Sequence, residues 1–117
     1  MSDPVVIYHN PRCSKSRAAL QLLEERGIEP QIIEYLKTPP DATRLKELLA
    51  MLGMSPRELM RKGEAPYKEL NLADEALDDD ALIAAMVANP ILIERAIVVA
   101  GAKARLGRPP EQILELL

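Results

Sequence analysis

Residues 5–20 read VVIYHNPRCSKSRAAL, and this stretch both decides the fold and contains the main candidate for chemistry. Its first part, Val5–Tyr8, is apolar and rich in β-branched residues, which predicts a buried strand. The pair Asn10-Pro11 favours a turn, and an amphipathic helical pattern begins at about Cys13. A strand, a tight turn and a helix therefore follow one another, with a thiol on the first turn of the helix.

Cys13 is the only cysteine of the chain, and its setting favours a reactive thiol over a buried structural one. Unpaired N–H groups and the helix dipole favour negative charge at a helix start. Nearby cations also favour the thiolate, which is the nucleophilic form. The cationic neighbours in sequence are Arg12, Lys15, Arg17 and, when protonated, His9. We therefore expect Cys13 to be the reactive group, with a pKa below that of a free cysteine.

The composition favours one aliphatic domain and argues against several classes of function. The 117 residues are 48% apolar but include no Phe or Trp, so they offer no aromatic platform for stacking bases. A net charge of −3 also argues against nucleic-acid binding. A single cysteine excludes an intrachain disulfide, and with a single histidine no metal site is expected. We expect a cytoplasmic protein without membrane segments, because a lone thiol suits a reducing compartment and neither a signal peptide nor a long apolar run is present.

The pattern after Cys13 predicts a βαβ unit. The helix is expected to run to about Arg26, before the helix-ending Gly27, and the next strand covers Gln31–Tyr35. The apolar face of this helix is predicted to carry Ala18, Leu20, Leu22 and Leu23. Two strands and a helix within so short a stretch predict parallel strands joined by a right-handed crossover.

A helical insertion of about residues 40–90 follows, and the chain then returns to strands. Helices are predicted over residues 41–52, from 55 to near 63, and over 78–89, with residues 65–67 irregular. Ile97–Ala100 and Lys103–Leu106 are expected to pair as a hairpin, and Pro109-Pro110 to start a final helix. The order βαβ, insertion, ββα predicts an α/β, thioredoxin-like fold with a mixed four-stranded sheet, in one domain of residues 1–117.

The segment Tyr8–Arg17 resembles the active-site loop of the arsenate reductase (ArsC) family, the type that couples to glutathione and glutaredoxin. The resemblance continues in order along the chain and covers nearly all of it. The further matching segments are Tyr35–Pro40, Leu59–Lys62, Pro90–Arg95, Ile97–Val99 and Gly107–Pro110. The resemblance implies a nucleophilic cysteine, here Cys13, and three arginines that bind arsenate or a similar oxyanion, here Arg61, Arg95 and Arg108. Arginine suits this role because its planar fork donates paired, charge-assisted hydrogen bonds to oxyanions.

The resemblance also implies glutathione as a co-substrate, glutaredoxin as a protein partner, and no tightly bound cofactor. Three residues of the loop are candidates for supporting roles. Ser16 takes the position of a second cysteine in a CxxC motif, so its hydroxyl would donate to the anion or to the thiolate, or would cap the helix. His9 would hold the thiolate by charge or hydrogen bond, or be structural. Asn10 would be a turn residue or order the Cys13 loop.

One residue departs from the family pattern. The family commonly has a proline directly after the arginine that Arg95 matches, whereas this chain has Ala96. A cis bond to a non-proline residue costs about 2.5–4 kcal/mol, so we expect a trans peptide between Arg95 and Ala96.

The function predicted first is the reduction of arsenate to arsenite, through a thiol–arsenate adduct and a glutathione mixed disulfide. Two alternatives stay open. One is a non-catalytic thioredoxin-like regulatory or interaction module, and the other is a general glutathione-linked thiol oxidoreductase.

Overall fold

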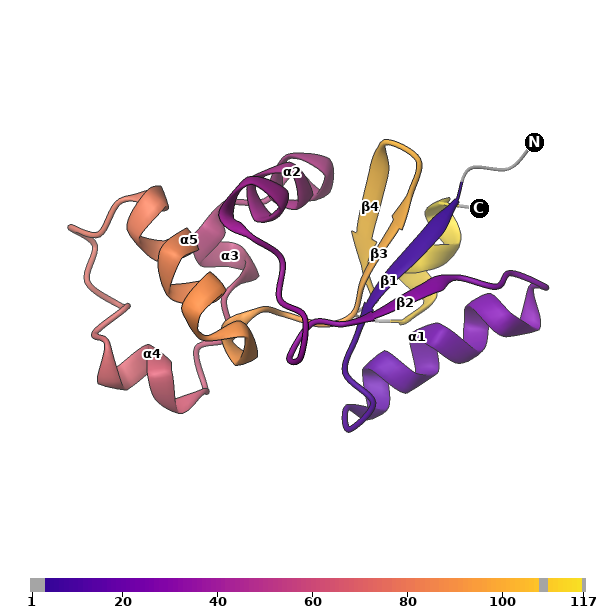
Figure 1. Ribbon diagram of the computed structural model, residues 1–117, viewed down its shortest axis with the longest axis horizontal. Coiled ribbons are helices and arrows are strands. Elements are labelled where there is room, and N and C mark those ends of the chain that lie inside the picture. Colours follow the sequence, from indigo (N-terminus) through magenta and orange to yellow (C-terminus); the bar gives the residue numbers. More distant parts are fainter. Residues whose placement is uncertain (1–3, 108–109, 117) are drawn as a thin grey trace. The chain divides into compact units, whose positions relative to one another are not determined.

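The computed structural model describes residues 4–107 and 110–116 (Figure 1). Contacts along the chain divide it into two compact units, the first of Met1–Thr38 with Arg95–Leu117 and the second of Pro39–Glu94. This division separates the two strand-bearing segments from the helical insertion. The prediction that residues 1–117 form a single domain stays a prediction.

The first unit is a mixed four-stranded sheet in the order β2-β1-β3-β4 (Figure 1). Its strands are β1 (Val5–His9), β2 (Gln31–Glu34), β3 (Ile97–Ala100) and β4 (Lys103–Leu106). β1 and β2 are parallel and are joined by helix α1 (Ser14–Glu25), whereas β3 runs antiparallel to both β1 and β4. The predicted α/β, thioredoxin-like order of βαβ followed by ββα is confirmed.

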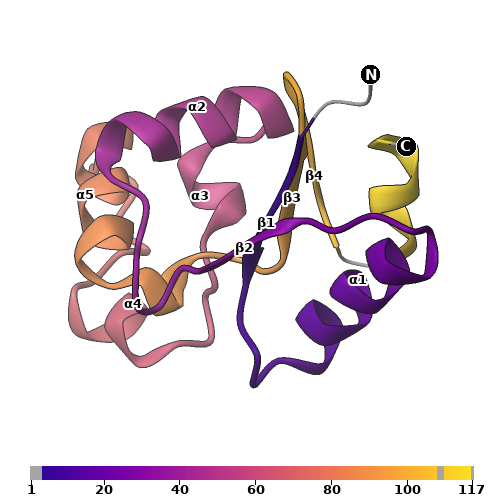
Figure 2. The ribbon, with the colours of Figure 1, turned by 45° about the vertical axis from the view of Figure 1, so that its right-hand side comes forward.

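Helix α1 and the C-terminal 3₁₀ helix η2 (Pro110–Leu116) lie on the same side of this sheet (Figure 2). The core between them consists of fully buried aliphatic side chains from the strands, from the residue directly before β3, from α1 and from η2. These are Ile7, Ala19, Leu23, Ala96, Val98 and Ile113. Leu20 and Leu22 are partly buried against this core, but the fully buried alanine of α1 is Ala19, not the predicted Ala18. The final helix is confirmed from residue 110, and Pro109 lies outside the described residues.

The second unit is helical, as the insertion was predicted to be. It contains α2 (Ala42–Leu52), α3 (Pro56–Leu59), α4 (Ala65–Glu69), α5 (Asp79–Ala88) and the 3₁₀ helix η1 (Pro90–Leu92) (Figure 1). Side chains cap three of these helices. Asp41 and Asp78 accept hydrogen bonds from backbone N–H groups in the first turns of α2 and α5, and Ser55 with Glu58 forms a capping box on α3. α5 packs against α2 and α3.

Two predictions for this unit were wrong. Residues 65–67 were expected to be irregular but belong to α4. Pro66 does not prevent this helix, because it lies in the first turn, where a proline is tolerated. α3 ends at Leu59 instead of near Gly63. Met60 is extended and pairs with Ile93, and these residues lie far apart in sequence, so a local pattern does not reveal the pairing.

The peptide bond between Arg95 and Ala96 is cis, so the trans prediction was wrong. That prediction weighed only the local preference of a non-proline peptide. Ala96 is fully buried, and its carbonyl oxygen accepts a hydrogen bond of 2.8 Å from the N–H of Gly107. The local preference of a peptide bond takes no account of such tertiary contacts.

Of the helices in residues 4–107 and 110–116, none combines the length and the apolar character needed to cross a bilayer.

Candidate active site

Cys13 lies at the junction between β1 and α1, one residue earlier relative to the helix than predicted. It is the N-cap residue, with extended backbone angles (φ −95°, ψ 123°), and its side chain is half-buried. Its N–H donates to the carbonyl oxygen of Asn10 at 3.0 Å, which closes the turn. Its own carbonyl oxygen accepts from the N–H of Arg17 at 3.0 Å, which begins the helix. The backbone on both sides therefore holds the thiol in place.

The surroundings of Cys13 lower the pKa of its thiol. Partial burial raises this pKa, but the Arg95 guanidinium and the backbone N–H groups of Ser16 and Lys15 outweigh the effect. These N–H groups lie near enough to the sulfur to stabilise the thiolate, although neither meets the geometry of a capping hydrogen bond. The sequence pointed to cations adjacent in the chain, whereas the cation with the main effect is Arg95, which precedes β3.

Arg95 is half-buried, and its guanidinium faces both a thiol and a phenol. Burial lowers the pKa of Arg95, but Cys13 and Tyr35 more than reverse this, so the pKa lies above its ordinary value. The arginine is therefore permanently charged. Its Nε is buried, and among the described residues it has no hydrogen-bond partner. A buried donor without a partner is costly in a folded protein, so an acceptor from a ligand would stabilise it.

His9, Asn10 and Ser16 form a buried hydrogen-bonded cluster beneath the Cys13 loop. The Ser16 hydroxyl lies 2.7 Å from Nδ1 of His9 and accepts a hydrogen bond of 3.0 Å from the backbone N–H of Asn10. The side-chain oxygen of Asn10 accepts from the N–H of Arg12 at 3.0 Å. Ser16 is fully buried, and the other two side chains are also buried. Asn10 is thus both a turn residue and a residue that orders the loop.

The ring of His9 is neutral at neutral pH. Burial lowers the pKa of His9 below 6.5, and Arg17 adds to this effect, while Glu34 opposes it. The ring and the Ser16 hydroxyl share a hydrogen bond of 2.7 Å, and the tautomer of the ring sets which of the two donates. A neutral ring brings no positive charge to the thiol, and the hydrogen bond of the ring is with Ser16 and not with the thiolate, so a role of His9 in holding the thiolate stays a prediction.

The structure brings several of the predicted site residues together in the first unit. The first unit brings Cys13 and Arg95 together, with His9, Asn10 and Ser16 in the same loop region. Arg61 belongs to the second unit, where its guanidinium forms an ion pair of 3.3 Å with Glu64. Arg108 lies outside the described residues. Among the residues that are described, no three His, Cys, Asp or Glu side chains are grouped so that they could hold a metal ion.

Tyr35 was not predicted as a site residue; it follows β2 and is almost completely buried. It contributes to the raised pKa of Arg95, so it helps to fix the charge beside Cys13. A signal was present, because the chain has only three tyrosines and this one is the last residue of the predicted strand Gln31–Tyr35. An aromatic residue at the end of a strand usually belongs to the hydrophobic core, however, so no role was predicted for its hydroxyl group.

Comparisons with known proteins extend over nearly the whole chain. A sequence model of the ArsC family matches residues 8–116, which include every candidate site residue. A protein of Escherichia coli (strain K12) named "Uncharacterized protein YfgD" is 63% identical over 118 residues, covering 100% of this chain and 99% of that protein. The arsenate reductase of Neisseria meningitidis serogroup A is 53% identical over 114 residues, 97% of each chain. A solved structure, the arsenate reductase from Vibrio cholerae, matches with a TM-score of 0.97 and 58% identity, covering 100% of both chains.

Proposed function

The chain belongs to the ArsC family, and we propose on this premise that it is an oxidoreductase that reduces arsenate to arsenite, with Cys13 as the nucleophile. One observation carries the proposal: a thiol of lowered pKa lies beside Arg95, whose buried Nε has no partner among the described residues. A thiolate supplies the nucleophile and a partly buried guanidinium supplies donors for oxyanion oxygens. Relatives that carry the name arsenate reductase support the same reaction.

In the first step, the Cys13 thiolate attacks arsenic(V). A sulfur–arsenic bond forms, an arsenic–oxygen bond breaks, and the oxygen leaves as water after protonation. Arg95 is the described arginine that lies beside the sulfur, so it would hold the anion against it and stabilise the charge that accumulates on the oxygens. The family resemblance assigns Arg61 and Arg108 to the same task.

In the second step, glutathione serves as the second thiol, because the chain has no other cysteine. The glutathione thiolate attacks the Cys13 sulfur, a disulfide bond forms, and the sulfur–arsenic bond breaks with its electron pair left on arsenic. Arsenic is thereby reduced to arsenic(III), and the two thiols are oxidised to a mixed disulfide. Glutaredoxin would then reduce this disulfide by thiol–disulfide exchange, which suits the reducing cytoplasm.

The buried cluster of His9, Asn10 and Ser16 has a positioning role in this scheme. It fixes the loop that carries Cys13, so the backbone N–H groups of the first helical turn stay directed at the sulfur. Ser16 serves this purpose through His9 and Asn10, and it needs no direct contact with the anion.

The test is a coupled assay that follows NADPH oxidation with glutathione, glutathione reductase, glutaredoxin and arsenate. We expect a rate that depends on arsenate and that disappears in Cys13→Ser, because serine is not ionised at neutral pH and forms no mixed disulfide. Phosphate replaces arsenate in the control, since it has the same charge and shape but is not reduced by thiols.

Two outcomes would reject the proposal. Absence of any arsenate-dependent rate with active partner enzymes would favour the non-catalytic interaction module. Reduction of a glutathione mixed disulfide at the same rate with and without arsenate would instead identify a general thiol oxidoreductase.

A further inference from the structure

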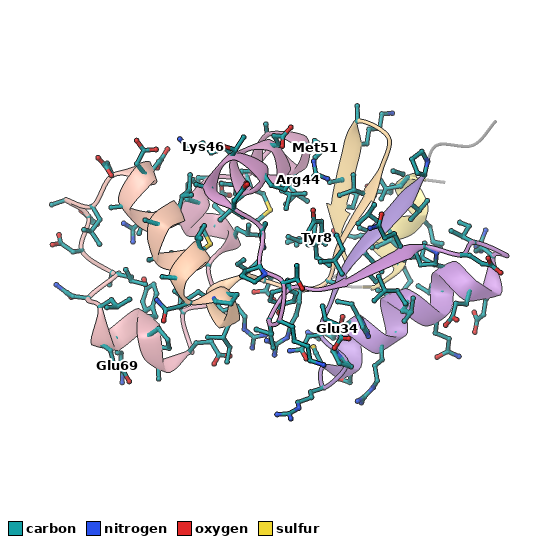
Figure 3. The ribbon with its side chains drawn as sticks, viewed as in Figure 1. Tyr8, Glu34, Arg44, Lys46, Met51 and Glu69 are labelled. Atoms are coloured by element: carbon teal, nitrogen blue, oxygen red, sulfur yellow. The ribbon has the colours of Figure 1, made fainter. Side chains whose placement is uncertain are left out.

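A cavity of about 260 Å³ opens beside the loop that carries Cys13. One wall is the loop itself, Asn10–Arg12, which ends directly before the cysteine. The other wall comes from the end of β2, where Glu34, Leu36 and Lys37 line the cavity. The two walls are neighbours because β1 and β2 are parallel, with His9 opposite Glu34. Figure 3 shows Glu34 at this end of β2.

The lining of the cavity carries two cations and one anion. Arg12 and Lys37 are exposed and positively charged, and Glu34 supplies the negative charge. His9, which also lines the cavity, is neutral because burial lowers its pKa. Leu36 adds an apolar surface, and 39% of it is exposed. The lining of the cavity therefore has a net charge of +1 and contains both positively and negatively charged side chains.

We propose that this cavity binds the glutathione peptide that attacks at Cys13, with Arg12 and Lys37 on its carboxylates and Glu34 on its ammonium group. The inference rests on the proposed use of glutathione. Glutathione has two carboxylates and one ammonium group, so its charges are the inverse of those lining the cavity. The cavity is slightly smaller than the range of about 300–1,000 Å³ that is usual for small-molecule sites, so part of the tripeptide remains in solvent. Because part of the bound glutathione remains in solvent, a second thiol could reach the mixed disulfide.

The charges that would bind glutathione are available without disrupting the fold. Lys37 and Glu34 form an ion pair of 3.6 Å, in which 77% and 41% of the respective side chains are exposed. Such exposed pairs contribute little to stability, so an exchange of partners costs little. Lys37 would turn to a carboxylate and Glu34 to the ammonium group.

The experiment measures glutathionylation of Cys13 by glutathione disulfide, so it needs no arsenate. The Cys13 thiolate attacks one sulfur of the disulfide, a new sulfur–sulfur bond forms, and one glutathione thiolate leaves. Mass spectrometry follows the gain of one glutathione over time. The neutral compound 2-hydroxyethyl disulfide serves as the second substrate, because it reacts at the same thiol but carries no charges for the cavity to bind.

The test variant is Lys37→Glu and its matched control is Lys46→Glu. Lys46 is also an exposed lysine in an ion pair, with Asp80 at 3.2 Å, but it lies on α2 in the second unit (Figure 3). The two variants change the net charge equally. We expect Lys37→Glu to slow glutathionylation about tenfold, since an attraction becomes a repulsion, and to leave the reaction with hydroxyethyl disulfide unchanged. Lys46→Glu should match the wild type with both disulfides.

Three results would overturn the inference. These are an unchanged rate of Lys37→Glu with glutathione disulfide, an equal slowing with both disulfides, and an equal slowing in the Lys46→Glu control. An inactive arsenate assay would reject the proposed function but would leave this measurement interpretable, because Cys13 reacts with the disulfide in either case.

Discussion

At the scale of single residues, the reactivity of Cys13 depends on which groups stabilise its thiolate. Burial of the sulfur opposes ionisation, whereas Arg95 and two backbone N–H groups favour it and prevail. The rate of alkylation by iodoacetamide, measured against pH, should therefore have its midpoint below that of a free cysteine measured in the same way. Arg95→Ala should raise this midpoint, because it removes a cation but leaves the helix start intact.

Arg105→Ala is the control for this measurement. Arg105 is an arginine on β4 that pairs with Glu115 at 3.0 Å, so its removal should leave the midpoint unchanged. A wild-type midpoint at or above that of free cysteine would contradict the thiolate assignment.

The Ser16 hydroxyl serves two buried partners, and its loss should destabilise the protein. Ser16→Ala leaves Nδ1 of His9 and the N–H of Asn10 without their hydrogen bonds in a buried place. An unsatisfied buried polar group costs about 1–3 kcal/mol, so the free energy of unfolding in urea should fall by about that amount. Ser14→Ala is the matched control, because this serine is exposed at the start of α1. Similar losses in both variants would argue against the cluster.

The lowered pKa of His9 makes stability depend on pH in a defined direction. The folded protein binds the proton on His9 less readily than the unfolded chain does, so the stability from the neutral ring is present above pH 6.5. It is lost as the pH falls through the lower, folded-state pKa. We expect the free energy of unfolding to decrease between pH 7.5 and pH 5 more steeply in the wild type than in His9→Gln. Parallel slopes in urea titrations of the two proteins would exclude this effect.

At the residue scale, the sequence predicted the candidate nucleophile but not all of its surroundings. Cys13 was identifiable because helix-start geometry and chain neighbours are local properties. The family resemblance implied Arg95 only as a ligand of the oxyanion. Its effect on the pKa of the thiol was not predicted, since Arg95 is remote in sequence from Cys13. The hydrogen bond between His9 and Ser16 was not predicted. The Ser16 hydroxyl could contact several groups near Cys13, and only atomic positions decide among them.

At the scale of elements, the contact between α1 and the end of β4 depends on a glycine. A Cβ at Gly107 would lie 3.0 Å from the Cβ of Ala19, and Ala19 is fully buried on α1. Gly107→Ala should therefore lower the free energy of unfolding by about 1–3 kcal/mol, as overpacked cores do. A double-mutant cycle with Ala19→Gly checks that a steric clash is the cause of this loss. Ala19→Gly removes the methyl group that the added Cβ at position 107 would meet.

In this cycle, Gly107→Ala should cost less in the Ala19→Gly background than in the wild type, even though a glycine in a helix has its own cost of about 1 kcal/mol. Strictly additive losses would show that Gly107 and Ala19 do not compete for space. Gly63→Ala serves as the control, since an added Cβ there would have no atom within 4 Å.

Element prediction from sequence succeeded where the signal was local and failed where it was not. Strands β1, β2 and β3 of the first unit were predicted from short apolar runs rich in β-branched residues, and α2 and α5 from their helical patterns. Asp41 and Asp78 cap these two helices in the structure. The end of α3 was missed, because it is set by the N–H of Arg61, which donates to the carbonyl oxygen of Leu92 at 2.7 Å. No pattern within residues 55–63 encodes that distant acceptor.

At the scale of the whole molecule, the fold class could be predicted because element order restricts topology strongly. A βαβ unit with a right-handed crossover and a terminal hairpin leaves few ways to form one mixed sheet. The candidate site could be predicted only in part. Cys13 and Arg95 meet within the first unit, whereas the roles of Arg61 and Arg108 still rest on the family resemblance and stay predictions.

The last prediction concerns these arginines, which are spread along the chain. Arg61→Ala, Arg95→Ala and Arg108→Ala should each lower kcat/KM for arsenate, because the loss of one donor from a preorganised oxyanion site costs about 10²- to 10³-fold in rate. Lysine at the same positions should restore only part of this, since an ammonium group cannot reproduce the paired donors of a guanidinium. Arg105→Ala should leave arsenate turnover unchanged.

Alkylation of Cys13 separates the two contributions that an arginine can make. Arg95 acts on the thiol itself, so Arg95→Ala should change both arsenate turnover and the alkylation midpoint. Arg61 is not among the described groups that lower the pKa of Cys13, so Arg61→Ala should lose arsenate turnover but keep the wild-type midpoint. The family resemblance alone leads us to expect a loss of turnover in Arg108→Ala as well. If both variants retain full turnover, their assignment to the oxyanion is wrong, and Arg95 with the helix start must suffice to hold the substrate.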